Sequence, residues 1–144
     1  MKKVWIITAN RSTARVFRAE NTHKLVEIKT LQHDEAHQHA RDVNTDRQGR
    51  VTKRQPYGTD TMQPHTTLET KESVRFAMEI AHMLDEGYKA GQFERLYIIA
   101  NPPFVGILHD ACKGPIAKLI EKEVHKDLTH CRSEQIREYL PPVL

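Results

Sequence analysis

Short apolar runs and longer amphipathic stretches follow one another along this chain. Residues 4–7 form a continuous apolar run of β-branched and aromatic side chains, which is typical of a strand covered on both faces. The segments 14–19 and 25–31 come next, each after a group of turn-forming residues. This pattern predicts three consecutive strands in an antiparallel meander.

A long helix is predicted to follow residue 66. Thr66 and Glu69 have the spacing of a capping box, in which a hydroxyl and a carboxylate satisfy free backbone donors at the helix start. Either Gly87 or Gly91 can supply the left-handed residue at its end. The apolar residues between these limits recur at steps of three and four: Val74, Ala77, Ile80, Ala81, Leu84 and Tyr88. We expect this helix to pack on the sheet.

A second buried strand is predicted over residues 96–100, and helical spacing begins after the turn at 101–103 and continues to residue 111. We expect Gly106, inside this helix, to allow close packing against the sheet. A helix that starts where a strand ends also attracts small anions. The chain has no glycine-rich phosphate motif at this point, however, so the turn is only a secondary candidate site.

The C-terminal part predicts a helix over residues 116–123, a short strand over 124–129 and a terminal helix over 133–140, capped by the Ser133 hydroxyl. The complete order is therefore β-β-β-α-β-α-β-α, which indicates an α/β protein with a sheet of mixed direction. This is the element order of ribonuclease H-like folds. With no internal repeat and no linker composition, residues 1–144 are predicted to form a single domain.

The segment 32–66, between the third strand and the long helix, has almost no apolar periodicity. Structureless segments of this length inside a domain are usually either functional or disordered. Four cations lie close together in it with no acidic residue between them, and an aromatic ring follows them, which suits contact with phosphates and stacking on bases. A solvated loop whose charge serves solubility explains the same residues. The candidate RNA-binding residues are Arg41, Arg47, Arg50, Lys53, Arg54 and Tyr57.

Histidines gather at the start of the same segment. His33, His37 and His39, with Asp34, offer imidazole nitrogens and a carboxylate to a divalent metal. Their spacing is not that of a known site, and histidines without a fixed scaffold bind transition metals weakly. We therefore predict neither a metal nor any other cofactor.

Residue patterns for catalysis are sparse. A ribonuclease H active site needs several carboxylates that converge on two metal ions, whereas the predicted strands hold only Glu27 and Asp127 as acids. Asp127 and His130 have the types of an acid/base pair, but no Ser or Cys nucleophile is placed by spacing to join them. These absences predict that the protein is not an enzyme.

The motif Lys126-Asp127-Leu128-Thr129 is predicted to stabilise the fold instead. We expect Asp127 to pair with Lys126, Arg132 or a nearby helix N-terminus, and we expect Leu128 to be buried.

Composition and charge narrow the functional classes only a little. Twenty-two Lys and Arg against nineteen Asp and Glu leave a net charge of +3, which permits an anionic partner without requiring one. Cys112 and Cys131 form no C-x-x-C pair, so we expect idle thiols.

The N-terminal apolar run 4–9 is too short for a signal peptide, and no stretch approaches the roughly 20 apolar residues of a membrane span. A cytoplasmic protein without a membrane partner is expected, and exposed sheet edges would permit a dimer.

Several segments, in this order, resemble the host attachment protein family, also described as proteins required for attachment to host cells. They are residues 5–11 with 14–17, 41–42 with 46–50, 103–108, and 126–130. The last is the most specific, because a Lys-Asp-Leu-Thr strand end followed by Glu134, Gln135, Ile136, Arg137 and Leu140 at helical spacing is not a generic pattern. The likeness covers nearly the whole chain.

That family is similar in turn to the middle domain of archaeal and eukaryotic peptide release factors and of the ribosome rescue factor Pelota, which have a ribonuclease H-like fold. In release factors, the loop that corresponds to residues 32–66 carries a Gly-Gly-Gln tip that positions water for peptidyl-tRNA hydrolysis. This chain has no Gly-Gly-Gln, and Gln48-Gly49 is only a reversed fragment. The resemblance therefore implies docking on ribosomal RNA without hydrolysis.

We accordingly expect a non-catalytic binding module that contacts RNA or the ribosome through its basic loop. An accessory role in attachment to host cells or surfaces, exerted through a protein partner, is the alternative that the family name suggests. A hydrolase acting on peptidyl-tRNA is disfavoured because the Gly-Gly-Gln tip is missing.

Overall fold

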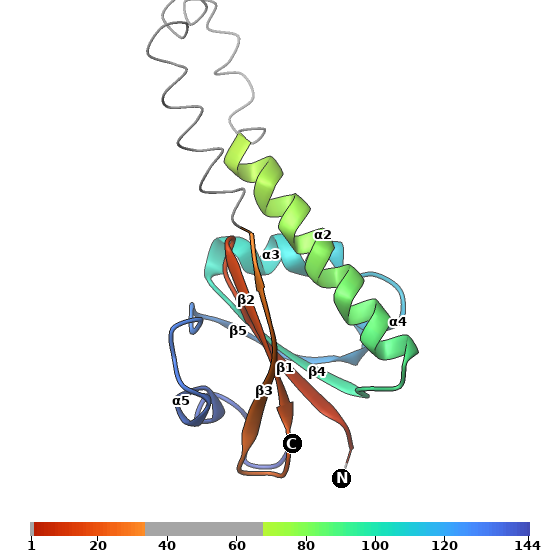
Figure 1. Ribbon diagram of the computed structural model, residues 1–144, viewed down its shortest axis with the longest axis vertical. Helices are drawn as coiled ribbons and strands as arrows, with labels where there is room; N and C mark the ends of the chain where they lie inside the picture. The colour runs from red at the N-terminus through yellow and green to blue at the C-terminus, as the bar shows by residue number, and fades with distance from the viewer. Residues whose placement is uncertain (1, 34–67) are drawn as a thin grey trace, which may run out of the picture.

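The central strand of the sheet is β1 (Val4–Ala9), in which every residue is buried. In the computed structural model, which describes residues 2–33 and 68–144, β1 pairs antiparallel with β2 (Thr13–Ala19) and parallel with β4 (Arg95–Ala100). The strands β3 (Leu25–Gln32) and β5 (Ile120–His125) form the two edges, giving the order β3-β2-β1-β4-β5. The predicted meander and the mixed direction of the sheet are confirmed (Figure 1).

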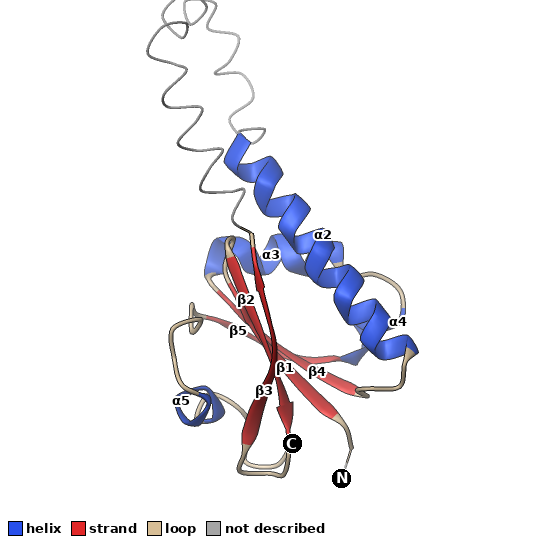
Figure 2. Ribbon diagram, viewed as in Figure 1, coloured by secondary structure: helices blue, strands red, loops and turns tan. Residues whose placement is uncertain are grey.

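Helices cover both faces of this sheet. The long helix α2 (Leu68–Lys89) and α3 (Pro102–Ala111) lie on one face, and the short α5 (Ser133–Arg137) lies on the other (Figure 2). Successive residues of β1 point to opposite faces, so Ile7 packs in the core under α2 while Ile6 packs in the core under α5. This double burial is the reason for the uninterrupted apolar run.

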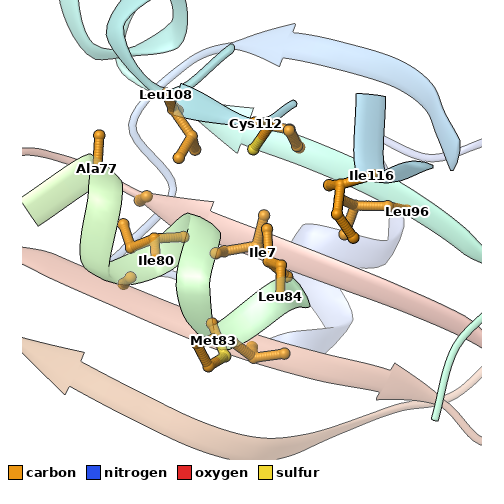
Figure 3. Close-up of a cluster of buried hydrophobic side chains, with 14 of the residues drawn as sticks. Ile7, Ala77, Ile80, Met83, Leu84, Leu96, Leu108, Cys112 and Ile116 are labelled. Carbon is orange, nitrogen blue, oxygen red and sulfur yellow. The ribbon is translucent and has the colours of Figure 1, made fainter. Parts of the chain in front are cut away.

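The core under α2 shows why that helix needs its periodicity. Ala77, Ile80 and Leu84 of α2 lie in one cluster with side chains of β1 and β4, and residues of α3 and of the turn after it complete the cluster (Figure 3). The predicted packing of α2 on the sheet is confirmed. Thr66, the residue expected to cap α2, lies outside the described residues.

The boundary between the predicted helix 116–123 and the predicted strand 124–129 is wrong. The helix α4 (Pro115–Leu119) is shorter, and β5 begins at once at Ile120. The pairing of β5 with β4 shifts register between Leu96 and Tyr97, so Ile120 packs in the core under α2 and Val124 packs in the core under α5. Two apolar residues four positions apart imitate helical spacing, but here a β-bulge turns them to opposite faces.

The expected cap of the terminal helix is also wrong. Helix α5 starts at Ser133 itself, so Arg132 occupies the N-cap position, and its backbone N–H donates to Oε1 of Gln135 at 2.8 Å. The helix ends at Arg137, after which turn hydrogen bonds lead to the buried Leu140.

The structure decides the roles of two glycines for which the sequence led to expectations. Gly91, with φ +72°, follows α2 in the left-handed region, and it is this residue and not Gly87 that serves the helix end. Gly106 has nothing within 4 Å of where a Cβ would stand, so the prediction that it allows close packing against the sheet is wrong.

The thiols are free in the structure. Burial, followed by the charge of Glu123, raises the pKa of Cys112 to about 11, which suppresses the reactive thiolate. Among the helices of the described residues, none is long and apolar enough to cross a membrane.

Candidate functional site

The polar residues that follow β1 and β5 meet at one end of the sheet. Asn10 shapes the turn between β1 and β2, because its Oδ1 accepts from the backbone N–H of Ser12 at 2.9 Å and of Thr13 at 2.8 Å. Its Nδ2 donates to Oδ2 of Asp127 and to Oγ1 of Thr129, both at 3.2 Å. A single amide therefore ties the first turn of the chain to the segment after β5.

Asp127 completes this cluster. Its Oδ1 accepts from Oγ1 of Thr129 at 2.6 Å and from the backbone N–H of Thr129 at 3.0 Å. Burial alone would raise the pKa of Asp127, but the hydrogen bonds from Thr129 and Asn10 outweigh it and lower the pKa below its usual range. The expectation that Asp127 pairs with Lys126, Arg132 or a helix N-terminus is wrong, since Asn10 and Thr129 take those places.

Leu128 and Lys126, two other residues of the motif 126–129, also pack against other parts of the fold. Leu128 is buried, as predicted, and packs in the core under α5. Lys126 places its Nζ 5.4 Å from the centre of the Tyr139 ring.

Arg15 of β2 extends the same cluster, and sequence reasoning did not find it. Its Nη1 donates to the carbonyl oxygens of Thr129 at 2.9 Å and Cys131 at 2.6 Å, and its Nη2 lies 2.9 Å from Oε1 of Glu27. The hydrogen bond from Arg15 lowers the pKa of Glu27, helped by one from Thr30 and opposed by burial. The only sequence signal was a cation in the middle of a half-apolar strand.

These contacts satisfy the cluster internally. Asn10, Arg15, Asp127 and Thr129 use their hydrogen-bonding atoms on one another and on nearby backbone, and Ser12 donates its hydroxyl to Asn10 Oδ1 at 3.2 Å. A catalytic constellation would aim such groups at an open position where a substrate atom could lie. The geometry instead joins the segment after β5 to the first hairpin.

Replacing Asp127 by Asn should reveal this role as a pH dependence. Because the pKa is lower in the folded than in the unfolded chain, the carboxylate stabilises the fold above its ordinary pKa of about 3.9, and that contribution disappears as the pH falls through the folded-state value. We expect Asp127→Asn to be less stable than the parent at neutral pH, with a difference that shrinks in acid. Urea unfolding at a series of pH values, followed by tryptophan fluorescence, measures it.

Asp110→Asn provides the matched control, since Asp110 is exposed on α3 and lies outside the cluster. Its effect on the free energy of unfolding should be small at every pH. An Asp127→Asn difference that stays constant into acid would contradict the assignment.

A second polar site lies where β3 ends and α2 begins. His33 is buried, with Nε2 2.8 Å from Oε2 of Glu72 and Nδ1 3.4 Å from Oε2 of Glu79. Its ring stacks on Phe76 with 5.2 Å between centroids. The contact between His33 and Glu72 holds the residue that follows β3 against the first turns of α2. Both ends of the segment between β3 and α2 are therefore anchored at one place.

This arrangement bears on the weak metal candidates. His33 uses both ring nitrogens on α2 carboxylates, while His37 and His39 lie outside the described residues. Within residues 2–33 and 68–144, no group of three or more His, Cys, Asp or Glu side chains could hold a metal ion.

The turn before α3 lacks the free backbone donors with which a helix start binds an anion. Pro102 and Pro103 have no N–H, and the N–H groups of Phe104 and Val105 both donate to the carbonyl of Asn101, at 2.9 and 3.1 Å. The hollow beside this turn is small, about 190 Å³. The anion site considered for this turn therefore has no free backbone donors at the start of the helix.

The six candidate RNA-binding residues fall outside the described residues, and their role stays a prediction: Arg41, Arg47, Arg50, Lys53, Arg54 and Tyr57.

The fold and its polar sites define the class of protein: a mixed α/β protein with an open five-stranded sheet, whose described polar clusters join distant segments to one another. The family model described as "Protein required for attachment to host cells" matches residues 5–140, and the chain belongs to this family. No curated protein matches the chain.

Proposed function

We propose that this member of the host attachment family is a non-catalytic, cytoplasmic binding module that contacts RNA or the ribosome through the segment between β3 and α2. The observation that carries the proposal is the cluster Arg47, Arg50, Lys53 and Arg54, with Tyr57 beside it. Cations with an adjacent aromatic ring suit a phosphate backbone with unstacked bases. The contact between His33 and Glu72 supports it, because it anchors both ends of this segment at one place.

The proposal includes a single domain of ribonuclease H-like fold, related to the middle domain of release factors and Pelota. The element order supports it, since a three-strand meander precedes the strands that are connected through helices. The missing Gly-Gly-Gln supports a role without peptidyl-tRNA hydrolysis.

Co-sedimentation with ribosomes across a salt series tests this function. We expect the intact chain to sediment with ribosomes at moderate salt, and a variant with Arg47, Arg50, Lys53 and Arg54 changed to Ala to stay in the supernatant. Each lost phosphate contact should also flatten the salt dependence, by about 0.7 in the log–log slope for single-stranded RNA.

A variant that loses four exposed cations elsewhere controls for net charge: Lys113, Lys118, Lys122 and Arg132, all changed to Ala. It should sediment like the intact chain. If none of the proteins sediments with ribosomes, or if both variants weaken binding equally, the proposed contact through the basic segment is wrong.

The family description favours a second candidate function, an accessory role in attachment to host cells through a protein partner. Recovery of the protein outside intact cells, together with failure to bind ribosomes, would favour this function over the first. Catalytic release of peptide from peptidyl-tRNA would overturn the non-catalytic assignment.

A further inference from the structure

A basic hollow of about 710 Å³ lies at the end of the sheet where β1 begins. Residues before β1, at the end of β2, in the middle of β3 and in the turn after α2 line it. Helix α2 has 22 residues, which at about 1.5 Å per residue span about 33 Å. The hollow adjoins the end of this helix, whereas His33 contacts Glu72 near its start.

Cations dominate the lining. Lys2, Lys3, Arg18 and Lys29 face a single carboxylate, Glu20. That carboxylate is shared, because its Oε1 lies 3.8 Å from Arg18 and its Oε2 lies 3.5 Å from Lys24. The hollow therefore keeps a clear excess of positive charge.

The individual cations are available to a ligand in different degrees. Nζ of Lys3 donates to the carbonyl of Gly91 at 2.8 Å, which fixes its position without neutralising its charge. Lys2 and Lys29 are exposed, and no carboxylate of the described residues lies within ion-pair distance of either. These two side chains can turn toward an anion without breaking an existing contact.

Apolar groups lie among these charges. Ile28 is 39% exposed, and it stands at the point where β3 shifts register against β2. Trp5 forms part of the inner wall and is held by stacking on Phe93, with 4.6 Å between ring centroids. Positive charge around a partly apolar wall suits a nucleotide, whose phosphate is anionic and whose base is flat and weakly polar.

We propose that this hollow binds a short stretch of single-stranded RNA, with phosphates on Lys2, Arg18 and Lys29 and a base against Ile28 near the edge of Trp5. The inference rests on the proposed function and deepens it, because it gives the protein a second RNA-contacting surface, beside the opposite end of α2 from the contact between His33 and Glu72. The two surfaces can be tested separately.

Trp5 is the single tryptophan of the chain, so its fluorescence reports directly on this hollow. The experiment titrates the full chain with a short oligouridylate at low salt, following Trp5 emission together with the anisotropy of the labelled RNA. We expect saturable binding with a matching change in Trp5 emission. In the variant Lys2→Glu/Lys29→Glu, affinity should fall about tenfold or more and the Trp5 response should disappear.

Lys113→Glu/Lys118→Glu changes the net charge equally at two residues that do not line the hollow, and it should leave both signals intact. Trp5 emission without RNA should be the same in all these proteins, which shows that the hollow is folded. Heparin serves as a polyanion without bases. If it changes Trp5 emission with the same apparent affinity as oligouridylate, the hollow responds to charge alone and the RNA assignment is wrong.

The variant with Arg47, Arg50, Lys53 and Arg54 changed to Ala separates the two proposals. Suppose that RNA does not change Trp5 emission in the intact chain and that RNA binding is lost in this variant. This result would overturn the proposal for the hollow and leave the proposed function standing. A Trp5 response that persists in this variant would support the hollow and, if ribosome binding also persists, overturn the contact through the basic segment.

Discussion

Replacing Gly87 by Ala is expected to destabilise the protein by up to about 2 kcal/mol. Gly87 lies inside α2, and a Cβ there would stand 2.7 Å from Cη2 of Trp5 and 3.3 Å from Cε1 of Phe93. Neither ring can move freely, because the two stack on each other at 4.6 Å and Trp5 is 5% exposed. The overpacking cost of about 1–3 kcal/mol exceeds the gain of about 1 kcal/mol that Ala brings to a helix interior.

Gly106→Ala is the matched control for this prediction. Gly106 is also helical, but the space around its missing Cβ is open. Only the propensity gain remains there, so the variant should be more stable by up to about 1 kcal/mol. Urea unfolding of both variants measures the difference, and equal effects of the same sign would refute the packing argument.

Replacing His33 by Ala is expected to cost about 2–3 kcal/mol. The change removes the contact of 2.8 Å to Glu72 and leaves that carboxylate buried with fewer partners. It also removes a ring that stacks on Phe76, and so opens a gap between β3 and α2. Thermal or urea unfolding gives the loss of stability directly.

His82→Ala controls for the loss of a histidine from the same region. The His82 side chain is 72% exposed and lies 3.5 Å from Glu86 on the surface of α2. Exposed pairs of this kind contribute little, so the change should stay within about 0.5 kcal/mol. If His33→Ala proved as mild as His82→Ala, the buried pair would not be the anchor that we describe.

Much of the fold was predictable from patterns a few residues long. The run 4–7 predicted a strand with two buried faces, and β1 packs in both cores. The three- and four-residue steps after residue 74 predicted α2. Errors came where such patterns are ambiguous: Ile120 and Val124 are four positions apart, and only their pairing with β4 shows that they belong to a bulged strand.

The candidate sites were less predictable, because their partners are far apart in sequence. Leu128 of the motif 126–129 is buried as expected, but Asp127 contacts the distant Asn10, and no local pattern indicates that contact. His33 was considered as a weak metal ligand and instead contacts the carboxylates of α2. The role of Arg15 was identified only from its contacts with Thr129 and Cys131 in the structure.

The sequence by itself determined which segments become strands and helices, which faces are apolar and to which family the chain is similar, because periodicity and composition are local properties. The tertiary structure decided which polar groups meet, which glycine accommodates Trp5 and where cations gather around a hollow. These features depend on strand order and register, which bring residues about a hundred positions apart within hydrogen-bond distance.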